Sequence, residues 1–342
     1  MTGDHILLAH GSGGVQMHAL IRDLFVAAFD NDTLRAGGDS ALLELAQALP
    51  GDRLAFTTDT YVVQPLVFAG GSIGSLAVHG TINDLAVAGA EPLALSAAFI
   101  LEEGLPIATL RTLVDDMAAA ARAADVPIVT GDTKVVARGQ CDGMYITTAG
   151  VGRVRLPHTL EPAAMRAGDA VVLSAPIGAH GVAVMSARAG MQFESPVASD
   201  TRPLHGLTRA MCAAVPAGAL RVMRDVTRGG LATTLNELAD ASGCAIEIDE
   251  DSILVEDAVA AACALMGFEV LHLANEGVLV AVVRAEAADA LVAAMRAEDA
   301  GRQARVIGRV DDQLPGTVRM RTAIGGTRMI TMLSGDLLPR IC

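Results

Sequence analysis

The chain has 342 residues, a formal net charge of −14 and a hydrophobic fraction of 52%, which indicates a globular protein of two domains with a sizeable core. No stretch of about 20 residues is apolar throughout, which excludes a spanning helix, and the acidic balance without a basic run argues against nucleic acid as a partner. The first residues lack a basic segment followed by a long apolar one, so we expect a cytoplasmic protein with no membrane partner.

A glycine-rich loop follows the first predicted element. We expect a short strand over residues 5–10 and a helix over residues 15–29. The residues between them are Gly11, Ser12, Gly13 and Gly14. A glycine loop between a strand and a helix can cradle phosphate with its backbone N–H groups. A tight turn would use the same residue types, so the loop alone leaves both interpretations open.

The rest of the chain alternates between apolar, strand-like stretches and amphipathic, helical ones. In the first half, strands are expected at 53–58, 93–101, 126–130 and 144–151, and helices at 73–88 and 106–124. In the second half, strands are expected at 170–174, 220–224, 245–249, 271–274 and 278–283, and short strands within 304–332. Helices are expected there at 179–189, 204–214, 230–241, 257–266 and 286–297. This alternation predicts α/β or α+β layers.

A stretch without clear periodicity divides the chain. It runs from Arg153 to Gly168 and contains two prolines. We therefore expect an N-terminal domain at 1–155, a C-terminal domain at 160–332 and a mobile tail at 333–342.

Acidic residues follow several predicted strands. Asp59, Asp132, Asp225 and Glu276 each come after an apolar run, and Asp39 and Asp84 stand beside small or polar residues in the same way. Converging carboxylates are costly unless cations neutralise them, and Mg²⁺ shared with substrate phosphates is the usual solution. Turn chemistry would explain any one of these residues. The repeated placement predicts an Mg²⁺–nucleotide site with Asp39, Asp59, Asp84, Asp132 and Asp225 as candidate metal ligands.

Lys134 is the only lysine in a chain whose other basic side chains are arginines and histidines. A lysine amine is a compact charge that can shift its pKa, whereas a guanidinium stays charged. A lone lysine two residues after Asp132 therefore suggests that the amine itself is required, with chance survival as the alternative.

The stretch from Arg224 to Gly230 precedes a predicted helix. Thr227 is the expected N-cap, and Gly229 would let a ligand approach the helix N-terminus closely. An ordinary capped helix with an ion pair between Arg224 and Asp225 would show the same residues. The eight histidines form no H-x-x-x-H or H-x-H pair, so neither a transition-metal site nor a histidine-based triad is expected.

The five cysteines are widely spaced and form no C-x-x-C pair, which argues against a zinc site or a disulfide framework. The four internal ones, Cys141, Cys212, Cys244 and Cys263, are expected to be small core residues. Cys342 is the last residue, so its thiol could enter another site and withdraw again. A frayed terminus is the alternative interpretation.

Taken together, these segments resemble the hydrogenase maturation factor HypE family, within the superfamily of aminoimidazole ribonucleotide synthetase (PurM-like) ATP enzymes. The resemblance covers essentially the whole chain. It is carried by Leu8–Gly14, Phe56–Asp59, Gly80–Asp84, Phe99–Pro106, Ile128–Val136, Arg224–Gly230, Ala274–Gly277 and Pro339–Cys342. The acidic loops specify only the superfamily, whereas the terminal Pro-Arg-Ile-Cys is what singles out HypE. Val226 stands where the family commonly has Pro or Ala.

The resemblance implies a PurM-like two-domain α/β (α+β) fold, with an N-terminal domain that forms a β-barrel in a homodimer and a C-terminal α/β sandwich domain. It implies ATP and Mg²⁺ as cofactors. It also implies that a carbamoyltransferase, HypF, loads a carbamoyl group onto Cys342, and that ATP-dependent dehydration turns this thiocarboxamide into a thiocyanate. The cyano group would then reach the iron of a [NiFe]-hydrogenase through a HypC–HypD complex.

The same resemblance implies a role for each matching residue. Cys342 would be the carrier, Lys134 the cation for developing charge, and Glu276 the proton acceptor, with Asp84 as the alternative acceptor. Nucleotide binding is implied for Gly11, Ser12, Gly13, Gly14, Asp59, Asn83, Asp132, Thr133, Asp225, Thr227, Arg228, Gly229 and Asn275.

Two other interpretations stay open at this point. Another PurM-like enzyme, such as thiamine-monophosphate kinase or selenophosphate synthetase, would need no terminal cysteine. The reactive N-terminal cysteine of the second is missing here, since the first cysteine is Cys141. A non-catalytic scaffold that only presents Cys342 would show no ATP turnover and would tolerate Lys134→Ala.

Overall fold

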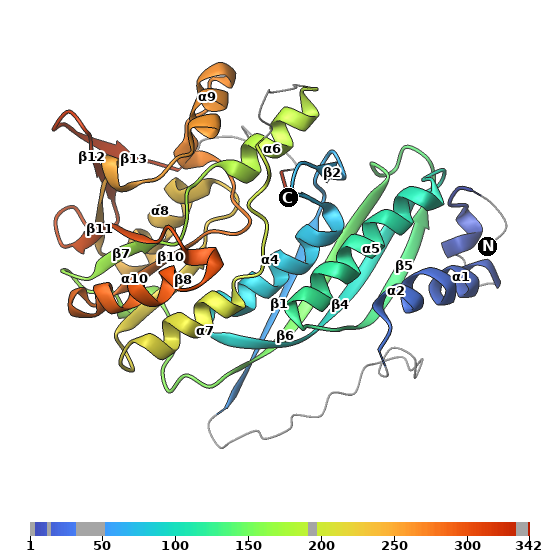
Figure 1. Ribbon diagram of the computed structural model, residues 1–342, viewed down its shortest axis with the longest axis horizontal. Coiled ribbons are helices and arrows are strands. Elements are labelled where there is room, and N and C mark those ends of the chain that lie inside the picture. The colour runs from blue at the N-terminus through green and yellow to red at the C-terminus, as the bar shows by residue number, and fades with distance from the viewer. Residues whose placement is uncertain (1–3, 12–14, 32–51, 191–196, 333–340) are drawn as a thin grey trace.

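Two β-sheets, each with its own helices, organise the chain (Figure 1). The computed structural model describes residues 4–11, 15–31, 52–190, 197–332 and 341–342. The first sheet ends at Val154 and the second begins at Ala170, on either side of the aperiodic stretch. The mixed α/β fold class is confirmed.

The first sheet has the strand order β1-β6-β4-β5. Its strands are β1 (Arg53–Tyr61), β4 (Ala90–Glu102), β5 (Ile128–Val136) and β6 (Met144–Val154). β6 pairs antiparallel with both β1 and β4, whereas β4 and β5 are parallel. A parallel pair needs a crossover, and here the helix between β4 and β5 provides it.

That crossover helix, α5 (Ile107–Ala124), and α4 (Ile73–Val87) pack together on one face of the first sheet. A short ribbon of β2 (Val67–Phe68) and β3 (Gly71–Ser72) leads into α4. Ser72 and Ser75 form a capping box at the start of α4, which satisfies backbone donors that the first turn leaves open.

The other face of the first sheet is exposed. Alternate residues of its strands point there, and Leu54, Phe56 and Ile100 are 59%, 73% and 41% exposed. Phe56 lies opposite Val151 and Ile100 opposite Lys134 in the strand register. We call this surface the open face. Large exposed apolar side chains gathered on one sheet face mark an interaction surface.

The N-terminal segment differs from expectation. Instead of a strand over 5–10, His5 makes one isolated bridge to Pro106, and Leu8–Gly11 form a 3₁₀ turn. Ile6 exchanges backbone hydrogen bonds with Gly104 and Leu105. The N–H of Leu7 then donates to Nδ1 of His10 at 3.0 Å, so local bonding ends this pairing. The expected helix over 15–29 is confirmed as a continuous helical run, α1 (Val15–Leu20), a π-turn at Ile21–Val26, and α2 (Ala27–Phe29).

The second sheet has the order β13-β12-β9-β11-β7-β10-β8. Its strands are β7 (Ala170–Leu173), β8 (Leu220–Asp225), β9 (Ala245–Asp249), β10 (Leu279–Val283), β11 (Arg305–Asp311), β12 (Val318–Arg321) and β13 (Thr327–Ile330). β10 is buried along its whole length, as a strand covered on both faces must be.

Helices cover both faces of this second sheet. The helices of this half are α6 (Ala179–Arg188), α7 (His205–Ala214), α8 (Gly230–Ser242), α9 (Asp257–Met266) and α10 (Ala288–Arg296). Of these, α6 and α9 pack against each other in a cluster of their own. One core gathers α8 with Val280 and Val282, and a separate core gathers α7 and α10 with Ala281 and Val283. These five helices agree with expectation to within about two residues.

One expected strand of the second half is absent. The stretch 271–274 instead begins inside a 3₁₀ turn at Val270–His272. A Cβ on Gly230 would lie only 2.4 Å from the carbonyl oxygen of Leu271 and 2.6 Å from that of Leu273. The carbonyl of Leu273 also accepts from the amide of Asn275 at 3.1 Å. These carbonyls are therefore turned toward the start of α8 and not toward a neighbouring strand.

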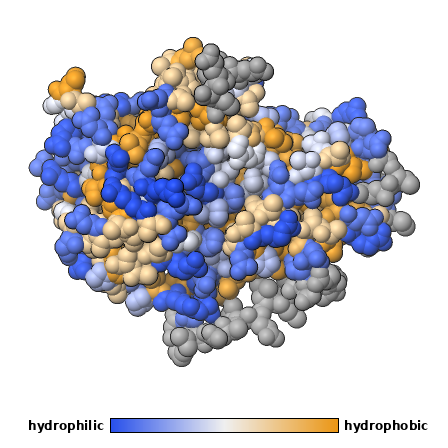
Figure 2. All heavy atoms as spheres, viewed as in Figure 1, coloured by the Kyte–Doolittle hydropathy of each residue, from blue (hydrophilic) through white to orange (hydrophobic). Residues whose placement is uncertain are grey.

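None of the described helices is long and apolar enough to cross a membrane. On the face shown in Figure 2, polar side chains spread over both halves of the molecule with apolar patches between them.

Gly74→Ala is expected to destabilise the protein, because a Cβ there would lie 2.1 Å from the carbonyl oxygen of Leu113 on α5. Separating the α4 and α5 backbones should cost about 1–3 kcal/mol. Gly206 on α7 is the matched control, since nothing lies within 4 Å of a Cβ there. Urea unfolding should show a loss for Gly74→Ala and little change for Gly206→Ala; equal midpoints would contradict the close helix contact.

Candidate active site

Four acidic side chains come together where the two sheets meet. Asp59 lies within β1, Asp84 in α4, Asp225 at the end of β8 and Glu276 in the loop before β10. Asp59, Asp84 and Asp225 all raise the pKa of Glu276, which places the four carboxyls within electrostatic reach of one another. Asp59 was expected at a strand end but lies inside β1, because that strand continues to Tyr61.

Burial controls the charge of these acids. It raises the pKa of Asp225 to about 7, and the nearby charge of Asp84 adds to the effect. Burial also raises the pKa of Asp84, although the Thr57 hydroxyl donates to its Oδ2 at 2.8 Å and opposes the shift. Buried carboxyls of this kind favour a cation beside them or a proton on them.

Glu276 is the most enclosed of the four acids. Only 3% of it is exposed, and its Oε1 has no hydrogen-bond partner among the described residues. Burial first, and then the charge of Asp200, raise its pKa well above the usual range. Its backbone N–H donates to Oδ1 of Asp200 at 2.9 Å. A carboxylate in this place binds a proton more strongly than one in water.

Two asparagines hold the loop that carries Glu276. The amide of Asn83 donates to the carbonyls of Arg202 and Glu276 at 3.0 and 3.1 Å. The amide of Asn275 donates to the carbonyl of Val226 at 2.9 Å, and its Oδ1 accepts at 2.6 Å from the N–H of Gly178. Both asparagine side chains therefore bind protein backbone. Their contacts are better suited to holding the Glu276 loop in place than to binding a nucleotide.

The end of the chain lies between the two halves of the molecule (Figure 1), where the charges of Glu276 and Asp59 act on Cys342. Ile341 is 2% exposed and belongs to the core of the first domain. Nε2 of His180 donates to the Ile341 carbonyl at 2.8 Å, and the N–H of Val62 donates to the Cys342 carbonyl oxygen at 3.1 Å. We call these contacts the tail seat. They bring a C-terminal residue against both domains.

His180 is neutral in the tail seat. Burial lowers its pKa to about 4, and its Nδ1 lies 2.8 Å from the Ser199 hydroxyl. Since Nε2 faces a carbonyl, Nε2 carries the hydrogen and Nδ1 accepts from the serine. No sequence motif marks His180, and its role becomes visible only through its contact with Ile341.

The Cys342 thiol faces the acids in this position. Burial first, and then the charge of Glu276, raise its pKa far above the usual range, while Arg228 opposes the shift. A seated thiol is therefore protonated and a poor nucleophile. This position suits a Cys342 that already carries a group more than one that must still attack.

Asp132 and Lys134 lie elsewhere in the described chain. Both are inside β5, opposite Ala98 and Ile100, and not after a strand end as expected, because β5 continues to Val136. The Lys134 amine pairs with the Asp132 carboxylate at 3.2 Å. β5 and β1 form opposite edges of the sheet with β6 and β4 between them, a separation of about 14 Å. A single chain therefore does not bring Lys134 to Cys342.

The remaining residues that were predicted to bind the nucleotide lie in separate parts of the chain. Ser12, Gly13, Gly14 and Asp39 lie outside the described residues, and Gly11 ends a 3₁₀ turn. Thr133 is buried on the helix-covered side of β5. Thr227 does not cap α8 as expected; Gly229 holds the N-cap position with φ +77°, and no side chain caps this helix. Arg224 pairs with Glu237 at 3.0 Å and not with Asp225.

Within the described ranges, no group of three or more His, Cys, Asp or Glu side chains is arranged to hold a metal ion. Mg²⁺ usually needs only one or two protein carboxylates, because substrate phosphates and water complete its shell. Asp84 and Asp225, whose pKa values are both raised by burial and by neighbouring acids, form such a pair of candidates.

Asp200 is expected to make the protein less stable as the pH rises. Burial raises its pKa from 3.8 to about 6, so the folded state holds this proton more tightly than the unfolded state. The stabilisation is complete below about pH 3.8 and is lost as the pH rises to about 6, a change of roughly 3 kcal/mol. Asp200→Asn keeps an acceptor for the N–H of Glu276 but cannot titrate. Urea midpoints should therefore fall less between those pH values in the variant, and identical pH profiles would contradict the assignment.

The fold and the site define a class of protein that the family comparisons also recognise. The model of the N-terminal domain of AIR synthase related proteins matches residues 37–154, and the model of their C-terminal domain matches residues 166–321. The chain therefore belongs to the class of AIR synthase related proteins and contains both of their domains.

Within this class, the chain belongs to the HypE family. It is 53% identical to carbamoyl dehydratase HypE of Cupriavidus necator over 336 residues, which is 98% of this chain and 94% of that protein. A crystal structure of hydrogenase maturation protein HypE in complex with ATP has a TM-score of 0.93 and 43% identity, covering 98% of this chain and 99% of that chain. A HypE–HypF complex has a TM-score of 0.79 and 43% identity, covering 92% of this chain and 100% of that chain.

Proposed function

We propose that the chain is an ATP-dependent carbamoyl dehydratase of hydrogenase maturation whose substrate is carried on its own C-terminal thiol. The tail seat carries this proposal, because it holds Ile341 in the core and sets Cys342 beside Glu276. A chain end that served only as an exposed tether would not need a buried Ile341 or a hydrogen bond from His180. The relative named carbamoyl dehydratase and the HypE structure in complex with ATP support the same reading.

In the proposed reaction, the group –S–CO–NH₂ on Cys342 becomes –S–C≡N while ATP becomes ADP and phosphate. The amide oxygen takes the γ-phosphoryl group and leaves as phosphate, and the nitrogen loses both of its protons, one to the departing phosphate and one to the protein. The chain must therefore supply a proton acceptor beside the tail. Glu276 in its ionised form is that residue, because its raised pKa makes the carboxylate a stronger base than an exposed one.

Bound Mg²⁺ would neutralise phosphate charge during phosphoryl transfer. We assign Asp84 and Asp225 as the residues that hold it, since a cation beside them would offset the cost of burying two acids. Asp59 completes the acidic wall that faces Cys342. Arg228 also acts on that thiol, and we assign it to the phosphates of ATP.

We further propose that two copies pair through the open face. Leu54, Phe56 and Ile100 would then be buried, and two four-stranded sheets could close into one barrel without free edges. If the β5 edge of one copy meets the β1 edge of the other, the partner's Lys134 would lie next to β1, the strand that carries Asp59, whereas one chain alone keeps the two strands apart. Lys134 would thus serve as the cation of the neighbouring site.

The tail has to leave its seat to be loaded. Seated Cys342 is half-buried and its thiol is protonated, so attack on a carbamoyl donor requires exposure first. The HypE–HypF complex of a relative supports HypF as the loading partner. We place HypC–HypD downstream as the acceptor of the cyano group. A cytoplasmic location is in line with the five cysteines, which are all free thiols.

Single-turnover phosphate release tests the proposal. Protein carrying a carbamoyl group on Cys342 should release one phosphate per loaded chain on addition of Mg-ATP, and unloaded protein should release little. Cys342→Ser, treated identically, is the control. Phosphate release that is equal with and without the loaded group would indicate an ordinary ATPase or kinase, and no release from loaded protein would favour a non-catalytic scaffold.

A further inference from the structure

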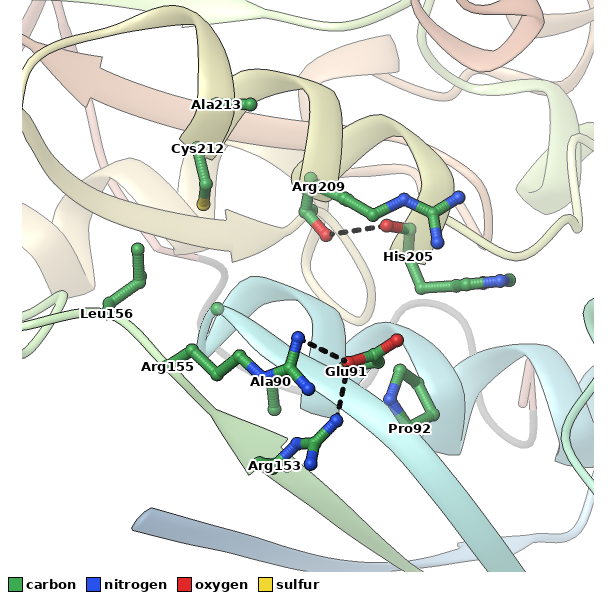
Figure 3. A pocket seen from close by; sticks show the side chains of 12 residues that line it. Ala90, Glu91, Pro92, Arg153, Arg155, Leu156, His205, Arg209, Cys212 and Ala213 are labelled. Atoms are coloured by element: carbon green, nitrogen blue, oxygen red, sulfur yellow. Dashed lines mark hydrogen bonds and ion pairs between the residues drawn. The ribbon is translucent and has the colours of Figure 1, made fainter. Parts of the chain in front are cut away.

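A second cavity lies away from the tail seat, between the two domains. It has a volume of about 310 Å³, at the lower end of the range for small-molecule sites, roughly 300–1,000 Å³. Its walls come from the turn between α4 and β4, the end of β6 and one side of α7 (Figure 3). Neither the acids of the active site nor the tail seat line it.

Positive charge gathers around this cavity. Arg153 and Arg155 share one carboxylate, that of Glu91, at 3.4 and 3.9 Å. Arg209 stands across from them on α7 (Figure 3), and its guanidinium makes no hydrogen bond or ion pair with any described side chain. Arg153, Arg155 and Arg209 outnumber the two nearby carboxylates, those of Glu91 and Asp125, and leave a local positive excess in a chain of net charge −14. Such an excess in a concave, partly apolar setting attracts anions.

His205 supplies a second, independent feature of the cavity. Its Nδ1 is buried and has no hydrogen-bond partner in the described part of the chain. Burial first, and then the charge of Arg209, lower the pKa of His205, so the ring is neutral. The other ring nitrogen faces the Ala124 carbonyl, which leaves Nδ1 as an acceptor without a donor. A buried acceptor of this kind costs free energy unless a ligand or water donates to it.

The floor between these charged groups is apolar. Ala90, Pro92, Leu156 and Cys212 line it (Figure 3). An inorganic ion would leave this surface uncovered, whereas a small molecule with an apolar body would fill it. The cavity thus combines an anion contact, a hydrogen-bond acceptor and an apolar wall.

We propose that this cavity between α7 and the β4–β6 end of the first sheet binds a small organic anion, a phosphate or carboxylate on an apolar or aromatic body that also carries one hydrogen-bond donor. Arg209 and Arg155 hold the anionic group, and Nδ1 of His205 accepts from the donor. Because the walls belong to both domains, the bound anion fixes the two domains relative to each other. It does so away from the site where Cys342 reacts.

Isothermal titration calorimetry tests this site on the full-length protein with its ATP site saturated by a non-hydrolysable Mg-nucleotide. The probes are AMP as an organic phosphate, 4-hydroxybenzoate as an organic carboxylate, and inorganic phosphate as an anion without a body. At least one organic probe should bind with a Kd below about 1 mM, and more tightly than inorganic phosphate. The probe that binds identifies the anionic group.

Two variants place the binding in the cavity. Arg209→Gln should weaken binding of the organic probe at least tenfold. Cys212→Leu, which fills the apolar floor of the cavity, should also weaken binding, without changing any charge. Arg111→Gln on the exposed side of α5 is the matched control and should bind like the original protein. The proposal would be overturned if neither organic probe bound, or if inorganic phosphate bound as tightly as the organic probes. It would also be overturned if the Arg209→Gln variant bound the organic probe as tightly as the original protein.

Discussion

Replacing Glu276 with glutamine is expected to lower the rate of thiocyanate formation by roughly 10²- to 10⁴-fold, the usual contribution of a positioned general base. The amide side chain cannot accept a proton, although it fills nearly the same buried space. Loading of Cys342 and binding of ATP should be unchanged, since the tail seat and the Asp200 contact use backbone atoms of Ile341 and Glu276. The measurement is a single turnover of loaded protein, followed by mass spectrometry of its C-terminal peptide.

Glu237→Gln is the matched control for this prediction. Glu237 lies exposed on α8 and pairs with Arg224, so its loss should leave the rate within about twofold. A Glu276→Gln protein that dehydrates the carbamoyl group at the original rate would remove Glu276 from the mechanism, and Asp84 would then be the acceptor to examine.

Lys134→Ala is expected to abolish turnover when both subunits of the dimer carry it. A Cys342→Ser subunit, which lacks only the carrier thiol, should restore part of the activity when it pairs with a Lys134→Ala subunit. The reason is geometric: in one chain Lys134 and Cys342 are separated by the width of the first sheet. In a dimer paired through the open face, the lysine of a Cys342→Ser subunit would serve the thiol of a Lys134→Ala subunit. Mixed dimers should therefore regain part of the activity that each variant alone has lost.

Co-expression with two different affinity tags allows the mixed dimer to be isolated and assayed in a single turnover. If Lys134 served its own subunit, neither site in this dimer would hold both residues, and the mixture would be as inactive as its parents. Phe56→Asp on the open face should separate the subunits and also prevent rescue. An inactive mixed dimer of normal stability would contradict the action of Lys134 across the interface.

Helices and buried strands could be predicted well from the sequence, because each carries its own periodicity. The residues around β5 show where such reasoning stops. Asp132 and Lys134 follow an apolar run and a glycine, which resembles the end of a strand, but pairing with β4 extends the strand to Val136. Only the register reveals that both side chains lie at the edge of the sheet opposite β1.

The residues of the tail seat show a different limit. His180 and Asp200 belong to no motif, and each is far in sequence from the group it contacts. Their roles depend on burial and on single hydrogen bonds to Ile341 and Glu276, which no local pattern encodes. Glu276 itself could be predicted as a site residue, although its loop resembles a strand until the contacts around Gly230 are seen.

The most direct test of the account is mass spectrometry of the C-terminal peptide through one reaction cycle. After incubation with HypF and carbamoyl phosphate, Cys342 should gain one carbamoyl group. On addition of Mg-ATP to the isolated, loaded protein, the same peptide should lose one water. A carbamoyl group that stays intact on Cys342 in the presence of Mg-ATP would contradict the central claim that this chain dehydrates a substrate carried on its own last residue.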